Sequence, residues 1–401
     1  MEMVRLNSSV LCGSLIAPLS KSDVHRAAIC SFLAGSELSS AASSNDINAT
    51  KNALKALSKN EQVINCGESG STLRFLIPIA AALGKAVTFT GEGRLPERPV
   101  GEYLRLLGQH GVKCEYSKTL PFAISGKLTP GLFELQGNVS SQYVTGLLFA
   151  LPLLDGNSEI RLLTPLQSKP YVNMTLKTLA RFGIVFNETE NGYYIKGNQS
   201  YKECNYPLEG DWSQAAFFLA GGALTGDVTL RGLDINSPQG DREIVNILRR
   251  FGAEVTLSEN GVRVKKSHLR AIKLDVSDIP DLVPVIAVLA AFAEGETEIT
   301  GGERLRLKES DRITSVVCNL KKMGVDVTET TDGMVINGGS VKGASLDGYN
   351  DHRIVMAFSI AAAAAEGETV ISDALSINKS YPEFFSDYLS LGGRADVISN
   401  R

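Results

Sequence analysis

Apolar stretches alternate along the chain with short clusters of polar and charged residues, and each cluster leads into an apolar stretch. The clearest apolar stretches are Leu147–Leu154, Leu282–Ala293 and Ile354–Ala365, whose length and composition predict helices. The longest of them, Leu282–Ala293, is interrupted by Pro284 and is shorter than the ~18 apolar residues that a membrane-spanning helix needs. The pattern therefore predicts a soluble protein with apolar helices.

Two other stretches, Glu243–Phe251 and Ile313–Met323, also predict helices, and each is followed by a glycine that suits a left-handed helix cap. Apolar and polar residues then alternate on both sides of a turn, which is Asn260-Gly261 in the first case and Asp332-Gly333 in the second. Asn-Gly and Asp-Gly between alternating segments are strong signals of a β-hairpin. The sequence thus predicts an α/β protein.

The same pattern of helix, glycine and strand recurs along the chain. Its five copies are marked by Gly111, Gly183, Gly252, Gly324 and Gly393, which are spaced by 72, 69, 72 and 69 residues. A single glycine after a helix is common, but a regular spacing indicates repeated supersecondary units. A period of about 70 residues predicts five to six units, arranged as two bodies of about three units each.

The composition is that of a folded soluble protein. The 401 residues are 43% hydrophobic and 21% charged, and the net charge is −4. A mildly acidic chain is a poor candidate for a general binder of nucleic acid or acidic membranes. The first residues, Met1–Arg5, show no signal-peptide pattern. We therefore expect a cytoplasmic protein that binds neither nucleic acid nor membranes.

Several kinds of site are excluded by the motifs that the sequence lacks. The six cysteines are scattered singly, which fits neither a zinc site nor a disulfide framework. The four histidines show no metal-binding spacing, so His352 is expected to orient a group or relay a proton. No GxxxxGK[ST] loop or GxGxxG turn is present, and Gly67–Ser71 is not a GxSxG serine elbow. We expect neither a metal nor a cofactor.

Cations are concentrated where the predicted helices begin. They are Lys21, Arg26, Arg74, Lys308, Arg312 and Arg353, with Arg94, Arg98, Lys169 and Lys379 in nearby loops. The helix dipole disfavours cations in the first turn, so the Ser, Asp and Asn residues beside them are ordinary helix caps but the cations are not. A bound anion would make them favourable. The sequence therefore predicts a site for polyanionic small molecules.

Several separated motifs, in a fixed order, resemble those of the 5-enolpyruvylshikimate-3-phosphate synthase family, over a range from about Leu15 to about Pro382. The motifs are Ser20-Lys21-Ser22 with Arg26, Glu97-Arg98-Pro99, Ser140-Ser141-Gln142, Ser168-Lys169-Pro170-Tyr171, Pro280-Asp281, Lys308-Glu309-Ser310-Asp311-Arg312, Asn350-Asp351-His352-Arg353, and Lys379 with Pro382. Each motif alone is weak, but the ordered set is highly specific.

The resemblance implies a fold and a domain organisation. The fold would be the α/β enolpyruvyl transferase fold, an inside-out α/β barrel in which two similar domains each contain three βαβαββ repeats. Residues 20–209 would form a shikimate-3-phosphate-binding domain, and residues 1–19 together with 210–401 would form the second. The active site would lie in the cleft between the domains, which would close over the substrates, and a monomer is expected.

The resemblance also implies the reaction. The family transfers the enolpyruvyl group of phosphoenolpyruvate to the 5-hydroxyl of shikimate 3-phosphate and releases phosphate. Shikimate 3-phosphate would be bound by Ser22, Arg26, Ser140, Ser141, Gln142, Ser168, Tyr171, Asp281 and Lys308. Phosphoenolpyruvate would be bound by Lys21, Gly70, Arg98, Gln142, Arg312, Arg353 and Lys379. Both substrates are multiply charged anions, in agreement with the cations at the helix starts.

Three residues match the family's catalytic positions. Asp281 would be the base that accepts the proton of the 5-hydroxyl, and Glu309 the acid and base at the methylene carbon of phosphoenolpyruvate. Lys21 is a second candidate for proton transfer. A carboxylate among cations ordinarily has a lowered pKa, so Glu309 would need substrate charge or burial to act as an acid. The division of acid and base roles among these three residues stays open.

Three positions depart from the common family pattern. Glu68 stands where Asn is frequent, Ser71 where Thr is frequent and Arg304 where Asn is frequent. These departures bear on the contacts with phosphoenolpyruvate rather than on the activity. The unsubstituted Gly70 suggests sensitivity to glyphosate, a family inhibitor that competes with phosphoenolpyruvate.

Three other functions fit the sequence less well. The related UDP-N-acetylglucosamine enolpyruvyl transferases typically carry a cysteine ahead of the Arg-Pro pair, and Gly91–Glu97 contains none. A ligand-binding sensor without turnover would not need Lys21, Asp281 and Glu309 together. A purely structural repeat protein would not need cations at its helix starts.

Overall fold

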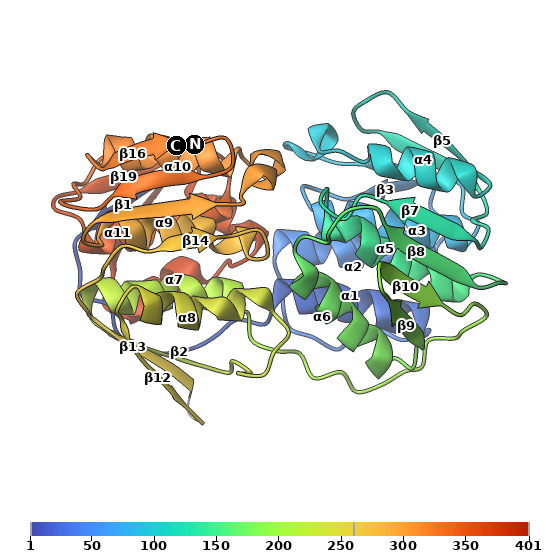
Figure 1. Cartoon of the computed structure of the whole chain (residues 1–401), viewed down its shortest axis with the longest axis horizontal. Coiled ribbons are helices and arrows are strands. Elements are labelled where there is room, and N and C mark those ends of the chain that lie inside the picture. Colours follow the sequence, from blue (N-terminus) through green and yellow to red (C-terminus); the bar gives the residue numbers. More distant parts are fainter. Residues whose placement is uncertain (1, 260, 400–401) are drawn as a thin grey trace. The chain divides into compact units, whose positions relative to one another are not determined.

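The computed structural model describes residues 2–259 and 261–399, and the chain divides into two compact units. Unit 1 consists of Met1–Ser20 and Glu209–Arg401, and unit 2 consists of Lys21–Leu208. Unit 2 is thus an insertion in unit 1, coloured from blue through green in Figure 1. The crossings that were expected near Leu19 and Gly210 lie at Ser20–Lys21 and Leu208–Glu209.

The two chain crossings are fixed by backbone hydrogen bonds inside unit 1. The N–H of Ser20 donates to the carbonyl of Glu209 at 2.8 Å, and the N–H of Asp211 donates to the carbonyl of Pro18 at 2.8 Å. The two segments of unit 1 are therefore hydrogen-bonded to each other at the point where the chain leaves the unit and returns to it.

All five sheets in the described chain have four strands in the same order, which is two parallel strands followed by two strands that pair in antiparallel fashion. In unit 2 they are β3 (Val63–Asn65), β4 (Val87–Thr90), β6 (Phe122–Gly126) and β5 (Val112–Tyr116), then β7 (Leu132–Leu135), β8 (Ser158–Leu162), β10 (Gly192–Ile195) and β9 (Phe186–Thr189). In unit 1 they are β12 (Glu254–Ser258), β13 (Gly261–Lys265), β11 (Asp227–Arg231) and β2 (Cys12–Ile16), then β14 (Lys273–Asp275), β15 (Glu296–Thr300), β17 (Met334–Asn337) and β16 (Asp326–Glu329), and finally β18 (Ser345–Leu346), β19 (Thr369–Ile371), β1 (Glu2–Asn7) and β20 (Arg394–Ser399).

Helices connect these strands. In unit 2 they are α1 (Lys21–Leu33), α2 (Asn45–Ser58), α3 (Gly70–Ala82), α4 (Gly101–Gln109), α5 (Ser141–Ala150) and α6 (Lys169–Arg181), with the short 3₁₀ helices η1 (Leu95–Glu97) and η2 (Leu151–Leu153). In unit 1 they are α7 (Trp212–Thr225), α8 (Ile244–Arg250), α9 (Val283–Ala291), α10 (Arg312–Lys322), α11 (His352–Ala364) and α12 (Phe384–Ser390), with η3 (Gly240–Glu243), η4 (Pro280–Leu282), η5 (Glu303–Leu307) and η6 (Ala374–Lys379).

The repeats are βαβαββ units, of which β14–α9–β15–α10–β16–β17 is a complete example. The last repeat of unit 1 takes its fourth strand from the start of the chain, because β1 pairs with β19 and with β20. The N and C marks accordingly lie side by side in Figure 1. In unit 2 the segment 21–62, which is described throughout, contributes helices α1 and α2 but no assigned strand.

The core of unit 1 is formed by α7, α9 and α11. Every residue of α7 and α9 is buried, and so are the residues of α11 from His352 to Ala363. These helices are apolar on all sides, so they are stable only when covered all round by other elements. Burying a side chain such as Leu or Ile contributes roughly 1.5–3 kcal/mol, so this helical core is the main source of stability in the unit.

The local predictions are largely confirmed. Helices α8 and α10 match the predicted stretches to within one residue at each end, and Gly252 and Gly324 adopt the left-handed conformation with φ of 92° and 82°. Both predicted hairpins form, as β12–β13 and β16–β17, although Asn260 of the first turn lies outside the described residues. The fifth marker was wrong by one residue, because the left-handed glycine is Gly392 and not Gly393. No helix of the described chain is both long and apolar enough to span a membrane.

Candidate active site

The residues predicted to bind or act on substrates lie mainly at the starts of helices. Several of these helices are capped by side chains that accept backbone N–H groups of the first turn, namely those of Ser69, Ser140, Asp211, Asp311 and Asp351. A cap satisfies only one of the exposed N–H groups, so the helix start stays electropositive. Cations in the same turn therefore need acceptor groups beside them, and the structure supplies carboxylates for Lys21, Arg312 and Arg353.

Arg312, the first residue of α10, is the centre of the cluster in unit 1. Its guanidinium donates to Asp281 at 2.8 Å, to Glu309 at 2.7 Å and to Asp351 at 2.8 Å, while only 1% of its side chain is exposed. Burial by itself would lower the pKa of Arg312, but the three carboxylates outweigh it and raise this pKa above its ordinary value. Arg312 is thus a permanent cation that holds three acids in fixed positions.

Asp281, in η4, accepts hydrogen bonds from three cations. Its Oδ1 atom accepts from Arg312 and, at 3.3 Å, from Lys308, and its Oδ2 atom accepts from Arg353 at 3.1 Å. Arg353 also donates to the backbone carbonyl of Asp281 at 3.3 Å. The side chain of Asp281 remains 18% exposed. The carboxylate is therefore oriented by the protein and still reachable from solvent.

Glu309 and Lys379 complete the predicted set in unit 1. Glu309 is paired with Arg312 and is 18% exposed at its side chain. Lys379, at the end of η6, is buried and donates through Nζ to the carbonyl of Asn350 at 2.5 Å. His352 is buried next to these groups, with Nδ1 3.8 Å from Asp351. The predicted residues Asp281, Lys308, Glu309, Arg312 and Arg353 thus form one connected network.

Besides Asp351, two residues next to this network were not predicted. Ser213, in the first turn of α7, accepts from Arg353 at 2.5 Å. Asp241 in η3 is buried, and burial, followed by the nearby charge of Asp281, raises its pKa to about 7. Ser213 lies in a polar cluster that the sequence shows at a helix start, whereas nothing in the sequence around Asp241 indicates that this carboxyl is buried close to Asp281.

In unit 2, the start of α3 lies against Arg98. A Cβ atom placed on Gly70 would lie 2.8 Å from Nη1 and 2.9 Å from Cζ of Arg98. Only a residue without a side chain allows this approach of the guanidinium to the helix start. Gly70 and Arg98 therefore form one structural feature, in which a cation covers the first turn of a helix.

A second arginine, Arg74 of α3, connects three segments of unit 2. Arg74 donates to Gln142 at 2.7 Å and to the carbonyl of Pro99 at 3.0 Å, and its guanidinium lies over the ring of Tyr143. Gln142 in turn donates to Ser71 at 3.0 Å. Burial, and then the charge of Arg98, lowers the pKa of Arg74. The predicted residue Gln142 is thus held in place by Arg74 and Ser71.

Arg26 brings α1 and α6 together. It donates to the carbonyls of Ser22 at 2.7 Å and Tyr171 at 2.8 Å and to the hydroxyl of Thr175 at 2.9 Å. Burial lowers its pKa to about 10. Through these hydrogen bonds Arg26 holds the backbones of Ser22 and Tyr171 in position.

The remaining predicted residues of unit 2 also lie at helix starts. Lys21 begins α1 and forms an ion pair with Asp46 at 2.8 Å. Ser140 caps α5, whose first residue is Ser141, and Ser168 precedes α6 in the left-handed conformation with φ of 55°. A left-handed serine is uncommon and is held in place only by its surroundings.

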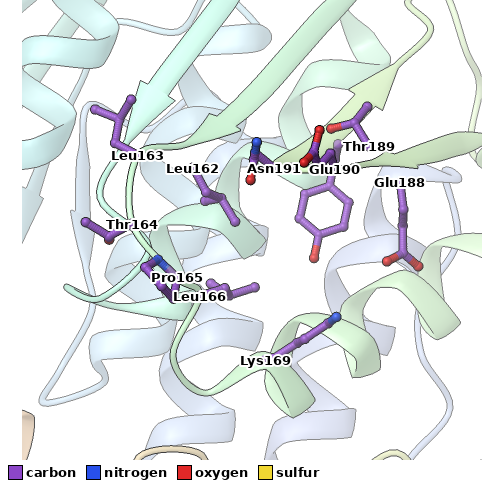
Figure 2. A pocket seen from close by; sticks show the side chains of 12 residues that line it. Leu162, Leu163, Thr164, Pro165, Leu166, Lys169, Glu188, Thr189, Glu190 and Asn191 are labelled. Carbon is purple, nitrogen blue, oxygen red and sulfur yellow. The ribbon is translucent and has the colours of Figure 1, made fainter.

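Lys169 is the first residue of α6. It lines a pocket of about 420 Å³ beside the β9–β10 hairpin, together with Glu188 and Tyr193. Figure 2 shows the Lys169 side chain extending from α6 towards this hairpin. No group of side chains among the described residues is arranged to hold a metal ion.

The fold is that of an enolpyruvyl transferase. The chain is similar over its whole length to a solved EPSP synthase from Acinetobacter baumannii, with a TM-score of 0.82 and 25% identity. It also shares its fold with the enolpyruvyl transferase NikO from Streptomyces tendae, with a TM-score of 0.76, 15% identity and coverage of 100% of this chain and 99% of NikO.

Sequence comparison defines the family. Residues 57–388 match the family model described as EPSP synthase (3-phosphoshikimate 1-carboxyvinyltransferase). A 3-phosphoshikimate 1-carboxyvinyltransferase from Clostridium kluyveri is 44% identical over 100% of this chain and 99% of its own length, and one from Methanococcus maripaludis is 39% identical over 96% and 97%. The chain belongs to the EPSP synthase family. The predicted family, fold class and enzyme class are confirmed.

Proposed function

We propose that this protein transfers the enolpyruvyl group of phosphoenolpyruvate to the 5-hydroxyl of shikimate 3-phosphate. The observation that carries the proposal is the network in which Arg312 and Arg353 hold the partly exposed Asp281 carboxylate. A transfer between two anions needs cations to bind the substrates and an oriented base to activate the hydroxyl. Family membership supports the same reaction.

Unit 2 is proposed as the shikimate-3-phosphate-binding domain. Its hydroxyl groups at the starts of α1, α5 and α6 suit a phosphate ester attached to a polyol, since hydroxyls both donate and accept hydrogen bonds. The proposed ligands are Ser22, Arg26, Ser140, Ser141, Gln142, Ser168 and Tyr171, with Lys308 and Asp281 of unit 1. The helix starts add backbone N–H donors for the phosphate.

Cations of both units are proposed to bind phosphoenolpyruvate, which carries a carboxylate and a phosphate. They are Lys21, Arg98, Arg312, Arg353 and Lys379, assisted by Gly70 and Gln142. Arginine forms paired hydrogen bonds with either anionic group, so the planar guanidiniums also orient the substrate. No resident cofactor takes part in this proposal.

The proposed reaction is an addition followed by an elimination. Asp281 accepts the proton of the 5-hydroxyl while Glu309 donates a proton to the methylene carbon, and a C–O bond forms at the adjacent carbon. The tetrahedral adduct then returns a proton from its methyl group to Glu309, the C–O bond to phosphate breaks, and phosphate leaves with the bonding electrons. Lys21 stays a second candidate for one of these proton transfers.

Replacing Asp281 by asparagine tests the catalytic role. Asp281→Asn removes the base but keeps the size of the side chain, so kcat is expected to fall by at least about 100-fold with a much smaller change in substrate binding. Steady-state phosphate release gives kcat, and calorimetry gives the affinity for shikimate 3-phosphate. Equal losses of turnover and binding would show that Asp281 only binds substrate.

We also propose that the protein acts as a cytoplasmic monomer that binds neither nucleic acid nor membranes. The net charge of −4 supports the exclusion of polyanionic macromolecules. Sedimentation equilibrium tests the oligomeric state, and a constant mass of about 43 kDa across protein concentrations is expected.

A further inference from the structure

Arg353 and Asp351 follow a loop whose backbone conformation is unusual. Tyr349 and Asn350 are consecutive left-handed residues, with φ of 53° and 47°. Residues other than glycine rarely adopt this conformation, and two in succession persist only where neighbouring groups hold them. The loop 347–350 therefore needs external support to place the start of α11.

Asn319 of α10 supplies part of that support. Its Nδ2 donates to the carbonyl of Asp347 at 2.8 Å, and its Oδ1 accepts the N–H of the same residue at 3.2 Å. The side chain of Asn319 is fully buried. A buried amide that uses both its donor and its acceptor on one backbone residue fixes the position and the orientation of that residue.

The same helix carries Arg312, which lies seven residues before Asn319. Two turns of α-helix separate these residues, so both side chains lie on the same face of α10. Arg312 contacts the side chain of Asp351, and Asn319 contacts the backbone of Asp347. Helix α10 thus holds the loop at both of its ends.

We infer that Asn319 is a positioning residue for the proposed reaction. It touches no reacting atom in this account, but it holds the loop that sets the positions of Arg353 and of the Asn350 carbonyl, to which Lys379 is bound. Both cations are proposed ligands of phosphoenolpyruvate, so the inference rests on the proposed function. Asn319 should consequently affect turnover and phosphoenolpyruvate affinity more than shikimate 3-phosphate affinity.

Asn319→Leu tests this role, because leucine has a similar size and can neither donate nor accept a hydrogen bond. A displacement of a catalytic group by about 1 Å can cost up to 100-fold in rate, so we expect kcat to fall by about 10-fold or more and KM for phosphoenolpyruvate to rise by about 5-fold. KM for shikimate 3-phosphate should change by less than about 2-fold. Asn319→Ser, which leaves a smaller and polar side chain, should show the same split if the leucine variant does not fold.

The matched control is Val317→Ala on the same helix. Val317 is also buried, but it lies about 160° around α10 from Asn319, and its side chain makes no hydrogen bonds. This variant should lose thermal stability and keep kcat and both KM values when assayed well below its melting temperature.

The outcomes are distinguishable. Variants of Asn319 that lose stability but keep the kcat and KM values of the unmodified protein would overturn the positioning role. A proportional rise in both KM values would also overturn it, because the substitution would then not act selectively on the binding of phosphoenolpyruvate. If the unmodified protein releases no phosphate from the two substrates, the proposed function fails instead, independently of Asn319.

Discussion

At the scale of single residues, the site depends on close approaches that leave no room for larger side chains. Gly70→Ala places a methyl group 2.8 Å from Nη1 of Arg98, so the guanidinium must move. We expect KM for phosphoenolpyruvate to rise by about 10-fold while KM for shikimate 3-phosphate changes little, because one displaced arginine costs roughly 1–2 kcal/mol of binding.

Gly108→Ala is the matched control for that substitution. Gly108 lies within α4, and a Cβ atom there would meet no described atom within 4 Å. Since alanine favours helix by about 1 kcal/mol over glycine, this variant should be as active as the unmodified protein and slightly more stable. A normal KM for phosphoenolpyruvate in Gly70→Ala would show that Arg98 does not bind this substrate.

Asp241 gives the stability of the protein a pH dependence of defined sign. The pKa of Asp241 is raised from 3.8 to about 7, so between about pH 4 and pH 7 the folded protein keeps a proton that the unfolded chain has released. The stabilisation that comes from protonated Asp241 is fully present below the pKa of 3.8 of the unfolded chain, and it is lost as the pH rises through the pKa of about 7 of the folded protein. The unmodified protein should therefore lose about 1–4 kcal/mol relative to Asp241→Asn over this range.

Urea denaturation of the two proteins at several pH values measures this difference. Asp227→Asn is the control, because a hydrogen bond from Arg263 lowers the pKa of Asp227 and reverses the sign of its effect. A difference between Asp241→Asn and the unmodified protein that does not vary with pH would contradict the assignment.

The sequence identified the cations of the site and two of their acid partners, Asp281 and Glu309, but not the others. Lys21 and Arg312 stand out because a cation at a helix start is unfavourable without an anion. Their acid partners Asp46 and Asp351 look like ordinary polar residues, since the pairing depends on how distant segments meet. Asp241 was missed for the same reason.

At the scale of secondary structure elements, buried ion pairs hold the helix starts of unit 1 together. Arg312→Met leaves Asp281, Glu309 and Asp351 without their shared cation, and breaking a buried pair costs about 3–5 kcal/mol. We expect the free energy of unfolding to fall by about that amount and activity to be lost. Chemical denaturation and phosphate release measure the two effects.

Arg263→Met provides the comparison for Arg312→Met. Arg263 pairs with Asp227 on the surface, where their side chains are 50% and 31% exposed. Exposed pairs contribute about 1 kcal/mol at most, so this variant should remain active and nearly as stable as the unmodified protein. Equal losses in both variants would contradict the central position of Arg312.

Elements that depend on neighbouring residues could be predicted from the sequence, whereas a sheet that is completed by a distant segment of the chain could not. Helix α10 and the β16–β17 hairpin follow from residues next to one another. The last sheet of unit 1 is completed by β1, which comes from the other end of the chain and carries no local signal of its partner. Likewise, Gly393 could be distinguished from Gly392 only by its backbone conformation.

At the scale of the whole molecule, each unit has its own hydrophobic core. One core cluster consists of residues of unit 1 and the other of residues of unit 2. Residues 21–208 expressed alone should therefore fold cooperatively. Near-ultraviolet circular dichroism and a thermal melt measure this, and the absence of a cooperative transition would contradict it.

Unit 1 should need both of its chain segments. A fragment of residues 209–401 lacks β1, whose Val4 and Leu6 are fully buried. It should be far less stable than a version in which residue 20 is joined to residue 209 by a short glycine linker, because the backbones of Ser20 and Glu209 already meet at 2.8 Å. Equal stability of the two fragments would show that the first strand is dispensable.

Phosphate release from phosphoenolpyruvate in the presence of shikimate 3-phosphate is the decisive test of the proposed reaction. In a parallel assay, UDP-N-acetylglucosamine replaces shikimate 3-phosphate as acceptor. We expect stoichiometric phosphate release with shikimate 3-phosphate and none above background with the UDP-sugar. No release with shikimate 3-phosphate, or equal release with both acceptors, would contradict it.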